Sequence, residues 1–167
     1  MTTRLATAAD VPALAALYAG VARALGPAVY TPAQVDAWVR FGADTPAFRD
    51  YVLGARTWVV ADDAGQALAF CGIDGGGEVR SLYVRAGHTR RGLGRSLLAH
   101  ALHDAEARGQ RRFAAWATPF SHPVFERAGF RLVARVMQDF QGVSFERLRL
   151  ERLPVIDGAA GGQGDTA

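Results

Sequence analysis

A short basic loop containing two glycines is the part of this sequence best suited to binding chemistry. Residues 89–94 read Thr-Arg-Arg-Gly-Leu-Gly, and Arg95 follows. Glycines let backbone amides approach an anion closely, and a helix beginning at Leu93 would add partial positive charge at its first turn. Arginine side chains can hold the outer oxygens of a phosphate. The loop therefore predicts a binding site for a phosphorylated ligand, and a tight turn with solvated arginines is the alternative.

Two common phosphate-binding motifs do not fit this loop. No Gly-Lys-Ser or Gly-Lys-Thr follows it, and its glycine spacing differs from that of the dinucleotide fingerprint. The prediction rests instead on position, between a strand expected at 78–85 and a helix expected at 93–108. That helix carries its apolar residues on one face, namely Leu97, Leu98, Ala101, Leu102 and Ala105.

The other expected elements complete a mixed α/β domain. Residues 113–117 predict a strand parallel to the 78–85 strand, reached by a right-handed crossover. Residues 57–61 and 67–73 predict an antiparallel hairpin. The remaining elements are a strand at 3–7, a helix capped by Asp10 and ending at Leu25, a helix from Thr31 toward Gly42, a helical segment at 48–53, a short helix at 123–128, and strands at 132–140 and 143–150.

Length and composition fit one domain. Half of the 167 residues are apolar, which is enough for one core, so residues 1–153 are expected to form the domain. The composition changes after Leu153, and residues 158–167 are small, polar and glycine-rich, so residues 154–167 predict a disordered tail. The sequence has no apolar run of about 18 residues, no secretory pattern and a single cysteine, Cys71, so a cytoplasmic protein is expected.

The positive charge comes from arginine alone. The formal net charge is +3, and the 19 basic residues are all arginine, with a concentration between Arg85 and Arg95. Local positive charge favours a phosphorylated ligand. Arginine also binds nucleic-acid phosphates, but no helix-turn-helix, zinc-finger or stacking pattern accompanies it, so no nucleic-acid partner is expected.

The amino-acid sequence resembles the GNAT superfamily of N-acetyltransferases over about residues 3–152. The segments that carry the resemblance are Leu82-Tyr83-Val84, the loop from Arg90 to Gly94, residues 124–130 (Val-Phe-Glu-Arg-Ala-Gly-Phe) and, more weakly, residues 30–38. The loop is similar to the coenzyme motif of the superfamily, except that Thr89 stands where Gln or Arg is usual. Residues 124–130 are similar to its Phe-Tyr-Glu-Lys-x-Gly-Phe helix.

The resemblance implies a fold and a co-substrate. The fold is a single mixed sheet of about six to seven strands, with helices on both faces and two splayed parallel central strands. Acetyl-CoA would be the co-substrate, its pantetheine arm lying between those strands. An amide near Val84 would donate to the thioester oxygen and to the later oxyanion. The residues expected to bind coenzyme are Leu82, Tyr83, Val84, Thr89, Arg90, Arg91, Gly92, Leu93, Gly94, Arg95, Ser96 and Phe125.

The implied reaction is acetyl transfer to a primary amine by direct attack, which needs a proton acceptor. Glu78 is the first candidate, because its offset from Val84 matches that of the base glutamate in histone-acetylating members. Alternation places Glu78, Arg80, Leu82 and Val84 on one strand face, so Arg80 is expected beside the carboxylate. A solvated ion pair at a strand start is the alternative for Glu78. Lesser candidates are Asp74, Tyr30, Tyr83 and His122.

The tyrosine that usually protonates the leaving thiolate is Phe125 in this sequence. Because a thiol has a pKa of only about 8.5, this loss should slow the reaction rather than abolish it, and Ser121 or water would supply the proton. A non-catalytic module that binds acyl-CoA is the alternative function.

The acceptor site is expected in the early helical region, with Tyr30 and Trp38 in contact with the substrate. The alternative to ligand contact for the tryptophans is packing in the core, which is expected of Trp38, Trp58 and Trp116. The expected acceptor is a small-molecule amine or a peptide, and neither a membrane nor a metal ion is expected as a partner. The protein is expected to be a monomer or a homodimer.

Overall fold

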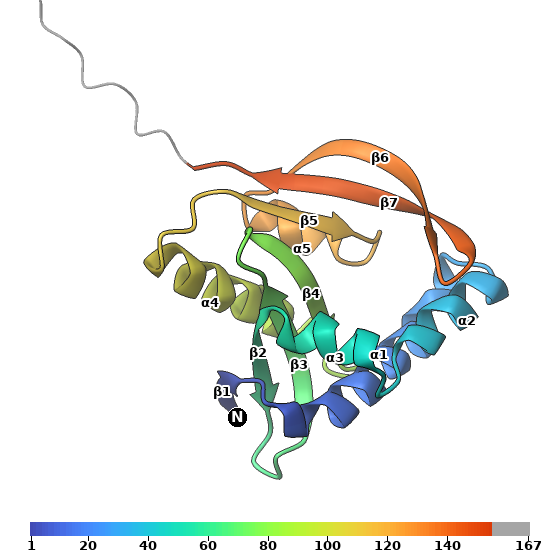
Figure 1. The fold of residues 1–167 in the computed structure, drawn as a ribbon, viewed down its shortest axis with the longest axis horizontal. Helices are drawn as coiled ribbons and strands as arrows, with labels where there is room; N and C mark the ends of the chain where they lie inside the picture. Colours follow the sequence, from blue (N-terminus) through green and yellow to red (C-terminus); the bar gives the residue numbers. More distant parts are fainter. Residues whose placement is uncertain (155–167) are drawn as a thin grey trace, which may run out of the picture.

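Residues 1–154, which the computed structural model describes, fold as a seven-stranded mixed sheet with helices on both faces (Figure 1). The strand order is β1-β2-β3-β4-β5-β7-β6, with β4 and β5 parallel. The expected fold class, the hairpin and the parallel crossover are confirmed. The predicted tail, apart from Pro154, lies outside the described residues.

The elements follow the predicted order with small shifts at their ends. The strands are β1 (Thr2–Leu5), β2 (Arg56–Ala61), β3 (Ala67–Ile73), β4 (Glu78–Val84), β5 (Phe113–Ala117), β6 (Arg131–Phe140) and β7 (Val143–Arg152). The helices are α1 (Val11–Leu25), α2 (Pro32–Phe41), α3 (Pro46–Leu53), α4 (Leu93–Ala107) and α5 (His122–Arg127), with 3₁₀ turns at Ala8–Asp10 and Gly26–Ala28.

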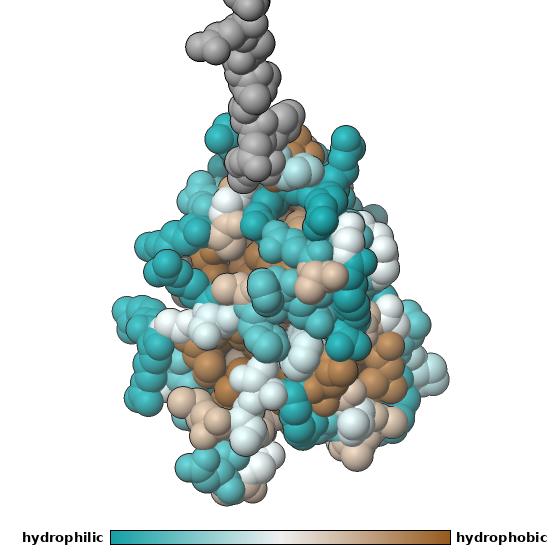
Figure 2. All heavy atoms as spheres, turned by 90° about the vertical axis from the view of Figure 1, so that its left-hand side faces the viewer, coloured by the Kyte–Doolittle hydropathy of each residue, from teal (hydrophilic) through white to brown (hydrophobic). Residues whose placement is uncertain are grey.

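Two apolar clusters cover the two faces of the sheet. In the first, which we call the α4 cluster, α4 and α5 pack against residues such as Cys71, Ala115 and Leu150. In the second, the α1 cluster, α1 to α3 pack against residues such as Val59 and Phe70. On the side of the molecule that carries α4, hydrophilic residues surround small apolar patches (Figure 2). The apolar residues predicted to share one face of α4 are all buried, which confirms its amphipathic pattern.

The first long helix is apolar because it is a core helix. By length and composition alone, the segment Ala8–Ala28 could cross a membrane. Val11, Leu14, Leu17 and Val21, however, are buried in the α1 cluster. This packing accounts for the hydropathy of the segment.

β4 carries a β-bulge at Arg80, opposite the step from Gly72 to Ile73 in β3. Beyond the bulge, Leu82 and Val84 pack in the α4 cluster. Glu78 and Arg80 instead line a cavity together with Tyr51 of α3, on the opposite face of the sheet. The predicted alternation, which placed all four β4 side chains on one face, is therefore wrong, because the bulge adds one residue to the strand.

The parallel strands β4 and β5 separate soon after they begin. Glu78 pairs with Ala114 and Val79 pairs with Ala115, and within residues 1–154 this ladder continues no further. One backbone edge of β4 is thus open from Arg80 to Val84. An open strand edge can accept an extended ligand as an additional strand. The two splayed central strands expected from the resemblance are confirmed.

Two glycines give opposite predictions for substitution by alanine. A Cβ on Gly72 would lie 2.5 Å from Oγ1 of Thr57, which donates a buried hydrogen bond to the Val52 carbonyl. Gly72→Ala should therefore lower the free energy of unfolding by about 1–3 kcal/mol. Gly20 lies inside α1, and a Cβ added there would meet nothing within 4 Å. Gly20→Ala should therefore raise the free energy of unfolding by about 0.5–1 kcal/mol. Urea unfolding measures both changes, and effects of the same sign would contradict the packing described.

Asp10 does not cap α1 as predicted. The helix begins at Val11, and the Asp10 side chain makes no capping hydrogen bond. Its carboxylate accepts instead from both terminal nitrogens of Arg4, at 2.8 and 2.6 Å, and from the Thr7 amide at 2.8 Å. These bonds turn the carboxylate away from the helix. The pKa of Asp10 is lowered to about 2, mainly because of the hydrogen bond with Arg4.

This ion pair predicts a loss of stability in acid. Because the folded-state pKa of Asp10 lies below its ordinary value of 3.8, the pair stabilises the fold above about pH 4, and its contribution disappears as the pH falls to about 2. Asp10→Asn should lower the free energy of unfolding by about 1 kcal/mol at neutral pH, since water screens the half-exposed Arg4. Near pH 2 the variant and the natural protein should be equally stable. A difference that persists there in denaturant titrations would contradict this account.

Candidate functional site

The loop between β4 and α4 presents backbone amides that have no protein acceptor. Helix α4 begins at Leu93, directly after Gly92, whose φ of 78° is left-handed. Arg90 also has a positive φ, 59°, which is uncommon for a non-glycine residue. Within residues 1–154, no amide from Thr89 to Arg95 donates to a protein oxygen, whereas the Ser96 amide bonds to the Gly92 carbonyl. We call residues 89–95 the amide loop, and it suits an anion such as a diphosphate.

The side chains around the amide loop leave it accessible and positively charged. Its arginines, Arg90, Arg91 and Arg95, are exposed. A Cβ on Gly92 would meet nothing within 4 Å, whereas one on Gly94 would lie 3.2 Å from a methyl group of Val84. Gly94 therefore lets the loop pack against the end of β4, and Gly92 leaves the first turn of α4 open.

The open edge of β4 leads toward the amide loop. The Arg85 amide donates to the Leu68 carbonyl of β3 at 2.8 Å. Because successive amides of a strand point to opposite edges, the Val84 amide points toward the separated β5. The side chain of Tyr83, the residue before Val84, stacks on Phe70 in the α1 cluster, with ring centres 5.2 Å apart. A ligand that lies along this edge can accept a hydrogen bond from Val84.

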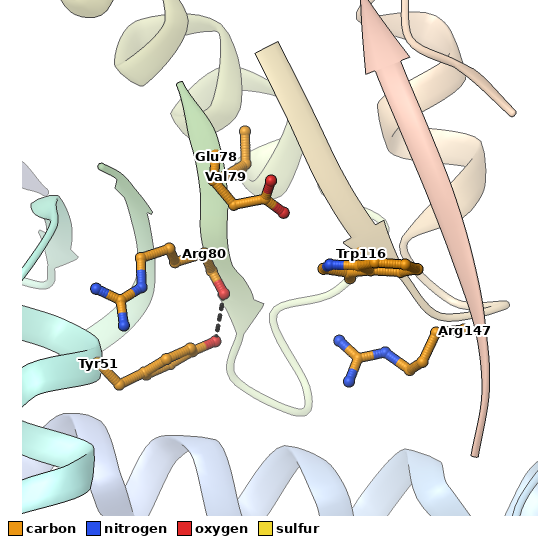
Figure 3. Close-up of a pocket in the computed structure, with 6 residues that line it drawn as sticks. All are labelled: Tyr51, Glu78, Val79, Arg80, Trp116 and Arg147. Atoms are coloured by element: carbon orange, nitrogen blue, oxygen red, sulfur yellow. Dashed lines mark hydrogen bonds between the residues drawn. The ribbon is translucent and has the colours of Figure 1, made fainter. Parts of the chain in front are cut away.

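A cavity of about 240 Å³ lies where β4 and β5 separate, on the face opposite α4. Its lining residues are Tyr51, Glu78, Val79, Arg80, Trp116 and Arg147 (Figure 3). Tyr51 and Arg80 lie on one side, Trp116 and Arg147 lie on the other, and the Glu78 carboxylate points between them. The Tyr51 hydroxyl donates to the Arg80 carbonyl at 2.6 Å, which joins α3 to the bulge of β4.

Glu78 is paired with Arg149 rather than with Arg80. Nη1 of Arg149 donates to both carboxylate oxygens, at 2.9 and 2.8 Å, and its guanidinium lies 5.0 Å from the centre of the Trp116 ring. Arg80 instead lies 3.6 Å from the exposed Asp50. The neighbour predicted for Glu78 is therefore wrong, because β7 supplies a closer arginine. Each carboxylate oxygen retains a free lone pair, so Glu78 can still accept a hydrogen bond from a ligand in the cavity.

Sequence reasoning missed Tyr51, Trp116, Arg147 and Arg149 as site residues, and alternation could have found three of them. In β5, Phe113, Ala115 and Ala117 are buried, which places Trp116 on the other face. In β7, Leu148 and Leu150 are buried in the α4 cluster, which places the two arginines on the cavity face. Tyr51 gives no such signal, because a tertiary contact brings α3 to the cavity.

The two residues expected to contact the acceptor lie in an aromatic group around α2. Trp38 is only 7% exposed and packs edge to face on Tyr30, with ring centres 5.8 Å apart. Tyr30 also packs on Phe145 at 5.3 Å. Burial raises the pKa of Tyr30, so its hydroxyl is protonated at neutral pH and does not act as a base. Neither residue lines the 240 Å³ cavity, and contact with an acceptor stays a prediction.

Ser121 and Phe125 occupy the turn and helix that follow β5. The Ser121 Oγ accepts from the Thr118 amide at 3.0 Å. Phe125 is 3% exposed and packs on Phe130 in the α4 cluster, with ring centres 5.1 Å apart. Ser121 therefore stabilises the turn after β5, and Phe125 packs in the core. Proton donation by Ser121 and coenzyme contact by Phe125 stay predictions.

The lesser candidates for the proton acceptor lie outside the cavity lining. The Asp74 carboxylate accepts from the amides of Gly76 and Glu78, at 2.9 and 3.0 Å, in the turn before β4. His122 lies 3.3 Å from Glu126 on α5. Of the candidates for the proton acceptor, only Glu78 lines the cavity in the described residues, and its role as the base stays a prediction.

Comparison with known proteins gives a family and a shared fold. The family model described as an acetyltransferase (GNAT) domain matches residues 27–152. A GCN5-related N-acetyltransferase from Rhodopseudomonas palustris has a similar structure, with a TM-score of 0.85 and 20% identity over 91% of this chain and 94% of that chain. No match to a curated protein was found.

Two further structures with the same fold were solved with coenzyme. PaiA N-acetyltransferase from Thermoplasma acidophilum, in complex with coenzyme A, has a TM-score of 0.74 and 12% identity over 92% of this chain and 99% of that chain. A phosphinothricin acetyltransferase from Sinorhizobium meliloti, in complex with acetyl-CoA, has a TM-score of 0.64 and 20% identity over 98% and 94%. These likenesses show the shared fold, and the family model covers most of the sequence. The chain therefore belongs to the GNAT acetyltransferase family.

Proposed function

We propose that this protein is an N-acetyltransferase that moves an acetyl group from acetyl-CoA to a primary amine. The observation that carries the proposal is the separation of β4 from β5 after Val79, beside a loop whose amides from Thr89 to Arg95 lack protein acceptors. The coenzyme complexes of PaiA and the phosphinothricin acetyltransferase support the same choice of co-substrate.

The residues present fit acetyl-CoA. The amide loop would hold the diphosphate, and Arg90, Arg91 and Arg95 would bind its outer oxygens. The pantetheine arm would lie along the open edge of β4, next to Leu82, Tyr83 and Val84. Leu93, Gly94 and Ser96 would shape the first turn of α4 beneath the diphosphate.

Bound acetyl-CoA would supply an activated acetyl thioester. Glu78 would take a proton from the attacking amine, directly or through water in the cavity. The amine nitrogen would form a bond with the acetyl carbon, which places negative charge on the acetyl oxygen before the carbon–sulfur bond breaks. The Val84 amide would donate to that oxygen, which contributes about 3 kcal/mol. Ser121 or water would supply a proton to the departing sulfur.

A second candidate is a module that binds acyl-CoA without turnover. It is favoured by Phe125, which stands where the superfamily motif has a tyrosine and is buried in the core. It is also favoured by the ion pair that engages both oxygens of Glu78.

We place the protein in the cytoplasm, as a monomer or homodimer, with a small amine or peptide as acceptor and without a nucleic-acid or membrane partner.

Calorimetry with acetyl-CoA, followed by thiol release over a panel of amines, tests these proposals. The proposed transferase binds acetyl-CoA, and at least one class of amine accelerates thiol release well above the rate with coenzyme alone. Binding without any acceleration would favour the module. Absence of binding would contradict both.

A further inference from the structure

Arg147 is a charged residue in the cavity without a partner from the described chain. It comes from β7 and lies beside Trp116, across the cavity from Tyr51 and Arg80 (Figure 3). Within residues 1–154 it forms no ion pair, and its Nε is buried without a hydrogen-bond partner. Glu146, the preceding residue, forms its ion pair elsewhere, with Arg135 at 3.3 Å.

The other arginines around the cavity already have carboxylate partners. Arg149 pairs with Glu78 at 2.8 Å, and Arg80 lies 3.6 Å from Asp50. A buried donor without an acceptor retains the unfavourable free energy of its desolvation, more so when it is charged. Arg147 thus leaves the cavity with a positive charge that no described acidic residue neutralises. An anionic group on a ligand would satisfy it.

We propose that the amine acceptor is a small molecule that carries a carboxylate, as a free amino acid does, and that Arg147 binds this carboxylate. The inference rests on the proposed acetyl transfer. The planar guanidinium matches a carboxylate in shape and charge, and can donate two parallel hydrogen bonds to it.

The cavity fits such an acceptor in size and in the placement of its charges. Its volume of about 240 Å³ is below the range of about 300–1,000 Å³ that is usual for drug-sized ligands. Glu78 and Arg147 line the same cavity, so the first can receive the amine while the second holds the carboxylate. A simple alkylamine or a peptide amide would leave Arg147 unpaired, and this disfavours the binding of both as acceptors.

Calorimetric titration of amino acids and their carboxamides tests the proposal without turnover. The probes are the common α-amino acids, β-alanine and 4-aminobutyrate, each compared with its carboxamide, on protein saturated with coenzyme A. The best amino acid should bind about 10- to 100-fold more tightly than its carboxamide, as expected for hydrogen bonds between charged groups. In Arg147→Gln this ratio should fall to about one.

Two controls separate recognition from folding. Arg147→Gln should not lower the unfolding midpoint, because the removed charge has no protein partner to leave behind. Arg135→Gln removes an exposed arginine from the neighbouring strand β6 and should keep the full ratio. Equal binding of acid and carboxamide, no binding of any amino acid, or a ratio that survives in Arg147→Gln would overturn the proposal.

Thiol release from acetyl-CoA distinguishes failure of this inference from failure of the proposed function. Carboxamides acetylated as fast as the acids would leave acetyl transfer standing and refute the role of Arg147. If no amine is acetylated while amino acids still bind through Arg147, the proposed transfer fails and the carboxylate site stands.

Discussion

Gly92→Glu should reduce the affinity for acetyl-CoA by at least about 100-fold. The Cβ of residue 92 faces open space at the first turn of α4, so the new carboxylate would lie among the amides that are proposed to hold the diphosphate. Two lost hydrogen bonds to charged oxygens, at about 1.5–3 kcal/mol each, already account for this loss, and repulsion between like charges adds to it. Isothermal titration calorimetry measures the change.

Gly142→Glu is the matched control for backbone strain and charge. Gly142 has a φ of 76°, against 78° for Gly92, and nothing lies within 4 Å of its Cβ. It lies in the turn between β6 and β7, so the substitution should leave coenzyme affinity unchanged. The two variants should lose similar stability, since each puts a side chain at a left-handed position. Unaltered affinity in Gly92→Glu would remove the diphosphate from the amide loop.

Glu78→Gln should lower the rate of acetyl transfer near neutral pH by about 100-fold, with little change in coenzyme affinity. The amide cannot accept the proton from the amine, and general base catalysis is worth about 100- to 10,000-fold. The rate of the variant should also lose the pH dependence that the carboxylate imposes. Steady-state kinetics across pH measures both effects, and an unaltered profile would exclude Glu78 from the mechanism.

The ion pair of Glu78 requires a second variant to interpret this result. Glu78→Gln leaves Arg149 without its carboxylate, which by itself can distort the cavity. Combining it with Arg149→Gln removes the unpaired charge and should restore the unfolding midpoint. If Glu78 is the base, the double variant stays slow. If Glu78 serves only to neutralise Arg149, the double variant recovers activity.

The strands and helices themselves could be predicted because they depend on local patterns. Apolar residues at helical spacing, such as Leu98 and Leu102, defined α4, and the Thr31-Pro32 pair correctly marked the start of α2. The glycines of the amide loop indicated anion binding because φ angles and open amides are properties of a short segment. These signals need no knowledge of distant residues.

Alternation could have shown which face some of the cavity residues occupy, but the contacts between them could not be predicted, because they join residues far apart in the sequence. The bond between Arg149 and Glu78 spans 71 residues, and it depends on β7 lying beside β5. The bulge at Arg80 changed the face of β4 side chains, although nothing in that strand's sequence announces it. The role of Asp10 was predicted wrongly for a different reason, since its carboxylate bonds to the nearby Arg4 of β1 rather than to its own helix.

A crystal structure with acetyl-CoA bound tests the central claim most directly. We expect diphosphate oxygens within hydrogen-bond distance of amides between Thr89 and Arg95, and the pantetheine arm between β4 and β5, with the acetyl oxygen at the Val84 amide. Coenzyme bound elsewhere, with β4 and β5 closed on each other or the amide loop covered by side chains, would contradict the account.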